Sequence, residues 1–329
     1  MKRKFAVPGV GSETPLELAA PAILLSKAAP LFDLEEAAAS GADMDAVHDM
    51  RVASRRLREA MRLLAPLYGK RRFRSWYRRV RCITRVLGPV RDSDVFIDAF
   101  SRLASDLGEG GRRCVAFMVG YRMGQRVREL EVLNAELAKL DLVRARAEFT
   151  EMARSVAAAD ETSRPLVSFA HEEVWKRADV VFAAQPAALT EENVTEQHEL
   201  RIDYKRLRYA VESFAPCYEE SFEELHVTLT AFQDALGDLH DTHVFLEMLS
   251  EPARVAMARV VGVSDEGIAE VVAVLQSMAR AHFERFVTLA REHPSEVLGP
   301  ALLEPLVEHR STRPAEGLQE VRGGRDVKR

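Results

Sequence analysis

The sequence predicts an all-α protein made of two similar halves, each like a four-helix bundle. Long stretches such as 112–159 and 253–291 are rich in Ala, Leu, Glu, Arg and Met, with apolar residues three and four positions apart. The alternating runs typical of strands are scarce, and a segment of the first half recurs in the second. These observations predict one domain over 13–310, with halves over about 13–165 and 166–310 related by a pseudo-twofold axis.

Glycine, proline and polar clusters divide the halves into helices. The clusters predict eight or more helices. The expected helix ends are at 40–41, 66–69, 88–89, 108–111, 160–165, 185–186 and 216. The sequence after residue 310 is STRPAEGLQEVRGGRDVKR, which is polar and contains glycine, so we expect a flexible tail over 311–329.

A repeat relates the two halves. HDMRVASRRLREAMRLLAPLY, which begins at His48, and HELRIDYKRLRYAVESFAPCY, which begins at His198, are identical at nine of 21 positions. Downstream, LGPVRDSDVFI at 87–97 aligns with LGDLHDTHVFL at 236–246, and the offset changes only from 150 to 149. Two ordered blocks at one spacing indicate two copies of one fold.

The composition indicates a soluble cytoplasmic protein with no membrane partner. The chain has 329 residues, 47% of them hydrophobic, and no apolar run near the roughly 18 residues that span a bilayer. Prolines and a glutamate interrupt the first 25 residues, so we expect no signal peptide. The cysteines form no CxxC pair, which favours reduced thiols over a disulfide framework or a zinc site. They are Cys82, Cys114 and Cys217.

Positive charge is concentrated in the first half, although the formal net charge is −5. Residues 1–150 contain 27 Lys and Arg against 19 Asp and Glu, a net charge of +8, and residues 151–329 contain 19 against 32, a net charge of −13. From His48 to Arg91 there are 13 arginines and one lysine against two acidic residues. Because arginine binds phosphate through two parallel hydrogen bonds, this block favours a phosphate-containing ligand.

Each copy of the repeat carries an apolar stripe beside a basic stripe, because residues three and four apart share one face of a helix. The first apolar stripe is Val47, Met50, Leu57, Met61 and Leu64. The first basic stripe is His48, Arg51, Arg55, Arg58 and Arg62. In the second copy, Leu200, Leu207, Val211 and Phe214 accompany His198, Arg201, Lys205 and Arg208.

The next helix of the first half carries a second basic row, about 20 Å long at 1.5 Å per residue. The row is Arg71, Arg74, Arg78, Arg81 and Arg85, beside the apolar positions Phe73, Trp76, Val80, Ile83 and Leu87. A solvated helix face is the alternative interpretation, but such a face normally mixes charges, and like charges four apart destabilise a helix. An anionic ligand would relieve the repulsion, so we interpret both rows as an anion-binding surface.

These motifs resemble the CHAD domain, the conserved histidine α-helical domain. The resemblance rests on HDMRVASRRLR, HELRIDYKRLRY and LGPVRDSDVF and covers about 13–310. It implies two four-helix bundles whose basic central groove or pore binds inorganic polyphosphate, without catalysis or a cofactor. It also implies association with polyphosphate granules, whose other proteins are further candidate partners. Some members carry an N-terminal CYTH triphosphatase domain, for which this chain has no room, so we expect a stand-alone member.

The resemblance also assigns residues to the polyphosphate site. One half supplies His48, Arg51, Arg55, Arg56 and Arg58, and the other supplies His198, Arg201, Lys205, Arg206 and Arg208. The basic rows add Arg62, Arg71, Arg74, Arg78, Arg81 and Arg85, and Arg91 could add a phosphate contact. In the second half, the positions of the second row read Glu220, Glu223, Val227, Thr230 and Asp234. We therefore expect the polyanion to lie asymmetrically, mostly against the first half.

The roles of His48 and His198 stay open, and the carboxylates that follow the first repeat block are interpreted as structural. His48 and His198 could contact phosphate or could be hydrogen-bonded structural residues, and their pKa values could be raised by a polyanion or lowered by the arginines. Asp92 and Asp94 follow a predicted helix break, so we interpret Asp92 or Ser93 as a helix N-cap.

Two rival functions belong to other classes. A metal-dependent phosphohydrolase could use His240, Asp241, His243 and Glu247, but further ligands are not identifiable, and we assign no metal or catalytic residue. A nucleic-acid-binding module would need stacking aromatic residues, and only Trp76 and Tyr77 lie in the basic helices. Nucleic acid is therefore not the expected partner.

Overall fold

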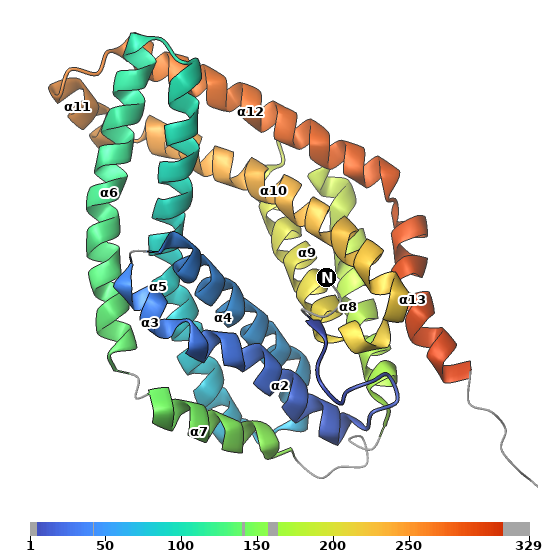
Figure 1. Cartoon of the computed structure of the whole chain (residues 1–329). Helices are drawn as coiled ribbons and strands as arrows, with labels where there is room; N and C mark the ends of the chain where they lie inside the picture. Colours follow the sequence, from blue (N-terminus) through green and yellow to red (C-terminus); the bar gives the residue numbers. More distant parts are fainter. Residues whose placement is uncertain (1–4, 42, 140–141, 157–163, 312–329) are drawn as a thin grey trace, which may run out of the picture.

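The computed structural model describes residues 5–41, 43–139, 142–156 and 164–311. Nearly all of them lie in helices, and these ranges contain two isolated β-bridges but no β-strand. The predicted all-α fold is therefore confirmed (Figure 1). In the described part of the chain, no helix is long and apolar enough to cross a bilayer. The predicted tail lies outside the described residues from residue 312 onward.

The helices follow a similar order in the two halves. The first half contains α2 (Leu16–Asp33), α3 (Glu35–Ser40), α4 (Met44–Leu64), α5 (Lys70–Leu103), α6 (Glu109–Leu137) and α7 (Leu142–Arg154). The second half contains α8 (Leu166–Ala188), α9 (Val194–Ser213), α10 (Phe222–Ser250), α11 (Pro252–Val260), α12 (Asp265–Glu292) and α13 (Ser295–Ser311). In the sequence alignment, α4 corresponds to α9 and α5 corresponds to α10. The pseudo-twofold axis and the domain boundaries stay predictions.

Local signals fix the start of α4, which carries the first motif. Gly41 adopts φ 64°, a left-handed conformation that ends α3 without the steric cost of a side chain. Two residues later, the side chain of Asp43 accepts a hydrogen bond of 2.8 Å from the backbone N–H of Asp45 and caps α4. The cap therefore fixes the start of α4 one turn before His48, and with it the face of the helix on which His48 lies.

The predicted helix break at Gly88 and Pro89 is wrong, because α5 runs without interruption from Lys70 to Leu103. Proline removes one helical hydrogen bond, which normally disfavours a helix interior. Leu87 and Val90 lie on either side of this pair and are fully buried. Burial of each such side chain contributes about 1.5–3 kcal/mol, enough to offset the loss.

Two apolar cores hold the helices together. The main core contains the predicted stripes of α4 and α9, namely Val47, Met50, Leu57, Met61, Leu64, Leu200, Leu207, Val211 and Phe214. It also contains Phe73, Trp76, Val80 and Leu87 of α5, with Ile83 partly buried against them. The second core lies where the far ends of α5, α6, α10 and α12 meet, around the stacked rings of Phe96 and Phe100 and the edge of Phe245.

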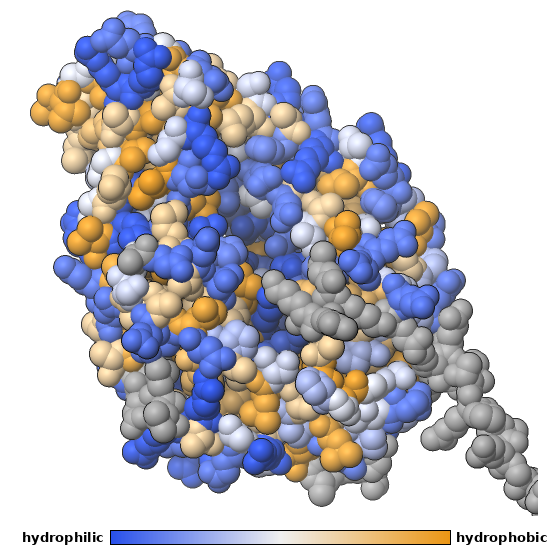
Figure 2. Space-filling model, in the orientation of Figure 1, coloured by the Kyte–Doolittle hydropathy of each residue, from blue (hydrophilic) through white to orange (hydrophobic). Residues whose placement is uncertain are grey.

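This arrangement brings the two copies of the motif together. Helices α4 and α9 contact each other, and the apolar stripes of both lie in the main core. In Figure 1, the long pairs α5–α6 and α10–α12 extend beyond them and meet at the far end. Figure 2 shows that this face of the molecule is hollowed near its centre, where hydrophilic residues gather.

Candidate anion-binding groove

Two adjoining cavities lie between the halves and share Arg51, Arg55 and Arg201. The first, which we call the carboxylate cavity, has a volume of about 330 Å³. Its polar lining is His48, Arg51, Arg55, Arg91, Asp92, Arg122, Arg201, His240 and Asp241. The second, which we call the cationic cavity, has a volume of about 360 Å³. Its charged lining is Arg51, Arg55, Arg58, Glu59, Arg62, Arg201, Lys205 and Arg206. Together they form the groove.

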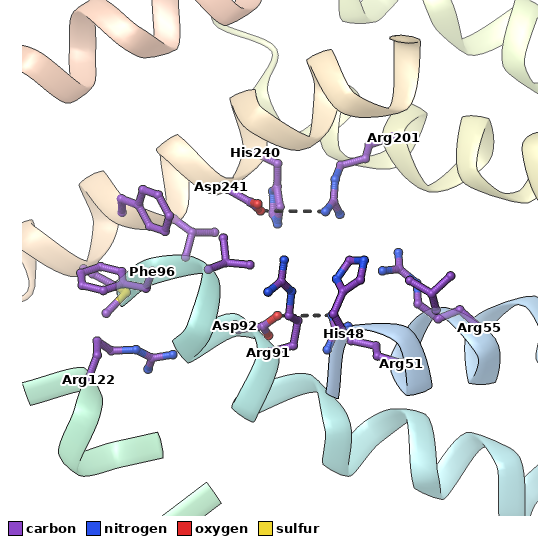
Figure 3. Close-up of a pocket in the computed structure, with 15 residues that line it drawn as sticks. His48, Arg51, Arg55, Arg91, Asp92, Phe96, Arg122, Arg201, His240 and Asp241 are labelled. Atoms are coloured by element: carbon purple, nitrogen blue, oxygen red, sulfur yellow. Dashed lines mark ion pairs between the residues drawn. The ribbon is translucent and has the colours of Figure 1, made fainter. Parts of the chain in front are cut away.

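Matched ion pairs occupy the carboxylate cavity. Nη2 of Arg51 lies 3.3 Å from Oδ1 of Asp92, and Nη2 of Arg201 lies 3.9 Å from Oδ1 of Asp241. The repeat places Arg51 with Arg201 and Asp92 with Asp241, so each half contributes one such pair. Figure 3 shows the pairs facing each other across the cavity. Burial raises the pKa of Asp241, Arg201 opposes this, and Asp92 adds to it.

Gly88 makes room for one of these arginines. A Cβ atom at Gly88 would lie 2.8 Å from Nη1 of Arg51, which is closer than real Cβ contacts. The aligned position in α10 is Gly237, where a Cβ atom would lie 3.8 Å from Nε of Arg201, an ordinary contact. A side chain at residue 88 would therefore displace the guanidinium end of Arg51 from this position.

Three cations of the cationic cavity have no carboxylate partner within the described residues. They are Arg55, Arg58 and Lys205, and we call them the anchor. The buried Nε atom of Arg58 has no hydrogen-bond partner in this part of the chain. Burial, followed by the charges of Arg55 and Arg201, lowers the pKa of Lys205 to about 7. The anchor therefore concentrates uncompensated positive charge.

The arginines at the far end of the cationic cavity are compensated. Nε of Arg62 donates to the Tyr77 hydroxyl at 3.0 Å, and Nη1 of Arg62 lies 3.5 Å from Glu59. Nη1 of Arg206 donates to Asp203 at 2.7 Å. Arginines held by acidic or phenolic oxygens therefore flank the anchor on this side, as they do in the carboxylate cavity.

His48 and His240 line the carboxylate cavity, and His198 contacts His240. His48 lies near Arg91, and the Nδ1 atoms of His198 and His240 are 3.1 Å apart. Burial lowers the pKa of each of the three, with neighbouring cations adding to the effect, and the pKa of His240 reaches about 4. Without a ligand, these imidazoles are therefore neutral at pH 7. One ring of the His198–His240 pair can donate to the other.

Arg56 and Arg208 are placed differently from the prediction, because both point to a buried carboxylate. Nε of Arg56 lies 2.6 Å from Oε2 of Glu212, and Arg208 and His226 bind Oε1 of the same residue. Burial alone would raise the pKa of Glu212, but the hydrogen bond from His226 and the charges of Arg208 and Arg56 lower it to about 2. These arginines therefore join α4, α9 and α10 and do not line the groove.

The second basic row also lies outside the groove. Arg71, Arg74, Arg78, Arg81 and Arg85 are exposed on α5 and line neither of its cavities. The opposite side of α5 pairs with α7 through Arg72 and Arg79. Thr84 lines the cationic cavity, and Arg81 lies one turn before it, so this arginine is nearer to the groove than Arg78. The row forms a solvent-exposed flank.

The predicted N-cap at Asp92 or Ser93 is wrong, because both residues lie inside α5. Asp92 pairs with Arg51, and the buried Asp94 pairs with Arg126 of α6. The sequence interpretation assigned Asp92 the role of a helix cap and Asp241 that of a possible metal ligand, although their alignment was a signal for a shared role as partners of arginine. Arg122, which the sequence interpretation missed, gave no signal, because it belongs to neither the repeated motif nor a basic row.

The proposed metal ligands do not converge in the described part of the chain. There, no group of three or more His, Cys, Asp or Glu side chains could hold a metal ion. His240 faces His198 and Asp241 faces Arg201, while Glu247 is exposed. The chemistry of this segment in the described structure is therefore hydrogen bonding and ion pairing.

The fold and the groove define an all-helical protein whose two halves supply arginines to one cationic groove. The family profile of the CHAD domain matches residues 22–250, which is most of the chain. The chain therefore belongs to the CHAD domain family, and the resemblance seen in the motifs is confirmed.

Two solved structures share the fold. The crystal structure of the CHAD domain from the plant Ricinus communis is 20% identical, with a TM-score of 0.58, over 92% of this chain and 95% of that one. PptA from Streptomyces chartreusis is 15% identical, with a TM-score of 0.62, over 84% of this chain and 100% of that one. No curated protein matches the sequence significantly.

Proposed function

We propose that this protein binds inorganic polyphosphate in the groove. The observation that carries the proposal is the anchor, because Arg55, Arg58 and Lys205 converge and none of them pairs with a carboxylate in the described part of the chain. Half-buried cations beside one another repel, and a polyanion would remove this repulsion. Membership of the CHAD domain family supports the same ligand class.

The dimensions of the groove suit a chain of phosphates. Between Arg51 and Arg62 the helix rises by roughly 16 Å, and arginines recur along it every three or four residues. Arg201, Lys205 and Arg206 of α9 face this row. Regularly spaced cations on two walls can bind successive phosphates of one linear polyanion, with bidentate hydrogen bonds from arginine.

The proposed role is binding without catalysis. A row of fixed cations can hold polyphosphate without activating water, whereas a metal-dependent hydrolase must do so. We expect no release of phosphate from polyphosphate during long incubation with magnesium or manganese. Metal-dependent release that is lost in His240→Ala would favour the phosphohydrolase instead.

Nucleic acid is a second polyanion with the same backbone chemistry. Binding of single strands normally uses aromatic side chains that stack on bases, and the rings of Phe96 and Phe245 at the groove are buried in the second core. We therefore expect polyphosphate to displace a labelled single-stranded DNA at equal phosphate concentration. The reverse order of affinity would favour the nucleic-acid-binding module.

We also propose that the protein associates with polyphosphate granules in the cytoplasm, where it would meet other granule proteins. The test is the position of a fluorescent fusion in cells that accumulate polyphosphate and in matched cells that do not. Foci that require both polyphosphate and the anchor support the proposal. Foci that persist in cells without polyphosphate would indicate a different partner.

The direct test is binding of long-chain polyphosphate by the purified protein at several salt concentrations. If several cations each neutralise a phosphate, affinity should fall steeply as salt rises, by analogy with counterion release from nucleic acids. Orthophosphate at the same phosphate concentration is the control for a nonspecific anion effect. Affinity that is independent of salt would contradict the proposal.

A further inference from the structure

The carboxylates of the groove are unevenly distributed along its length. Asp92 and Asp241 balance Arg51 and Arg201 at one end, and Glu59 and Asp203 balance Arg62 and Arg206 at the other. The three cations of the anchor lie between these ends. The anchor in the middle of the groove therefore carries charge without a carboxylate partner, whereas Arg51 and Arg201 on one side and Arg62 and Arg206 on the other are already paired. Arg91 and Arg122 also line the carboxylate cavity and have no carboxylate partner in the described residues.

A phosphate gains different amounts in these two places. At the anchor it meets cations that have no carboxylate partner in the described residues and relieves their mutual repulsion. At Arg51 or Arg201 it must replace a carboxylate that is already paired, so one ionic contact is exchanged for another. The displaced Asp92 or Asp241 then stays beside the phosphate as a like charge, which opposes the exchange.

Chain length changes this balance. A phosphate that is linked to another phosphate already held at the anchor has an effective concentration near Arg51 that reaches the millimolar range for a short flexible connection. A free orthophosphate or pyrophosphate lacks this advantage. The exchange at Arg51 and Arg201 therefore favours long chains.

On the basis of the proposed function, we infer that the groove selects polyphosphate by length. The anchor binds short and long phosphate chains alike, and Asp92 and Asp241 restrict Arg51 and Arg201 to chains that extend beyond the anchor. The two aspartates are specificity-determining residues that act through the arginines they pair with. The ligand class of the anchor is an inorganic phosphoanhydride, with pyrophosphate as its short form.

The test compares pyrophosphate and long-chain polyphosphate with the double variant Asp92→Asn and Asp241→Asn. Asparagine keeps the shape of each side chain and removes its charge. Affinity for the long chain should rise about tenfold, and the magnitude of the salt dependence should increase by roughly one to two neutralised phosphates. Pyrophosphate should keep its affinity for the anchor within about twofold at 0.15 M salt, where the Debye length is about 8 Å, and should gain a second, weaker site at the freed Arg51 and Arg201.

The matched control is Asp98→Asn with Asp265→Asn. These aspartates pair with exposed arginines outside the groove, so the control changes the net charge equally. Its affinity for both ligands should match that of the wild type. An equal gain in the control would overturn the inference, because net charge alone would then explain the effect.

Other outcomes also decide the matter. Failure of pyrophosphate to gain a second site in the aspartate variant would overturn the role of the aspartates in selection by length, and a loss of long-chain affinity would show that they position the arginines for binding instead. The variant Arg55→Gln with Lys205→Met should lose pyrophosphate binding, which tests the anchor independently of the aspartates. Failure of the wild type to bind the long chain would instead refute the proposed function.

Discussion

Arg56 in the first half lies with its Nε atom 2.6 Å from Oε2 of Glu212 in the second half. Glu212 is fully buried, and Arg208 and His226 bind its other carboxylate oxygen. By the repeat, Glu212 stands where the first half has Arg62, a groove residue. Arg58 and Arg62 of the first half line the groove, whereas the aligned Arg208 and Glu212 of the second half form a buried ion pair. With a glutamate in place of the arginine, this position links the two halves through Arg56.

Glu212→Gln should destabilise the protein strongly. The variant leaves the buried charges of Arg56 and Arg208 without their carboxylate, which costs about 3–5 kcal/mol in comparable sites. Chemical denaturation monitored by circular dichroism would measure the change in the free energy of unfolding. The exposed pair provides the control, since Asp98→Asn should cost less than about 1 kcal/mol.

The carboxylate of Glu212 should make the free energy of unfolding depend on pH in the acidic range. Its pKa is about 2 in the folded protein and about 4.3 in an unfolded chain, so its contribution is present above pH 4.3 and is lost as pH falls towards 2. The wild type should therefore lose stability over this range by more than Glu212→Gln does. Parallel acid-unfolding curves for the two proteins would contradict this account.

Lys205 should make polyphosphate binding depend on pH. Its pKa is about 7 without a ligand, and a bound polyanion would raise it, so binding above pH 7 takes up a proton. Affinity should fall as pH rises from 7 to 9, by at most about tenfold per pH unit. Lys205→Arg keeps the charge throughout this range and should abolish the dependence, as isothermal titration at several pH values would show.

Lys205 should also destabilise the protein that has no ligand. Its pKa is lowered on folding from about 10.4, so the cost is full below pH 7 and disappears as pH rises towards 10. Lys205→Met should therefore raise the free energy of unfolding near pH 7 by on the order of 1 kcal/mol. A lower stability of this variant at pH 7 would indicate that Lys205 has a stabilising partner in the folded protein.

The exposed row of α5 should matter less than the anchor. Arg74, Arg78 and Arg81 lie outside the cavities, so replacing them by glutamine should weaken binding of long-chain polyphosphate by a few-fold, mainly through long-range attraction. The loss should be greatest at low salt. A loss as large as that of the anchor variant would place the ligand along α5 and restore the interpretation based on the rows.

Much of the fold was predictable because the repeat and the apolar stripes depend on local spacing. Val47, Leu57 and their counterparts in α9 are buried as the spacing predicts. The continuation of α5 through Pro89 was not predictable, since it depends on the burial of Leu87 and Val90 by distant helices.

The site was predictable only in part for the same reason. Arg51 and Arg201 are aligned and both line the groove. Arg58 and Arg208 are also aligned, yet Arg58 lines the groove and Arg208 is buried. The difference depends on Glu212, one helical turn away, whose partners come from three helices and are not visible in the spacing of any one of them.

The central claim is that the anchor binds polyphosphate, and replacing its cations tests this most directly. The triple variant Arg55→Gln, Arg58→Gln and Lys205→Met is compared with Arg102→Gln, Arg113→Gln and Arg259→Gln, which removes three exposed arginines outside the groove. Circular dichroism first verifies that both variants are folded. We predict that the anchor variant binds long-chain polyphosphate about 100-fold more weakly than the control at 0.15 M salt. Equal affinity of the two folded variants would contradict the account.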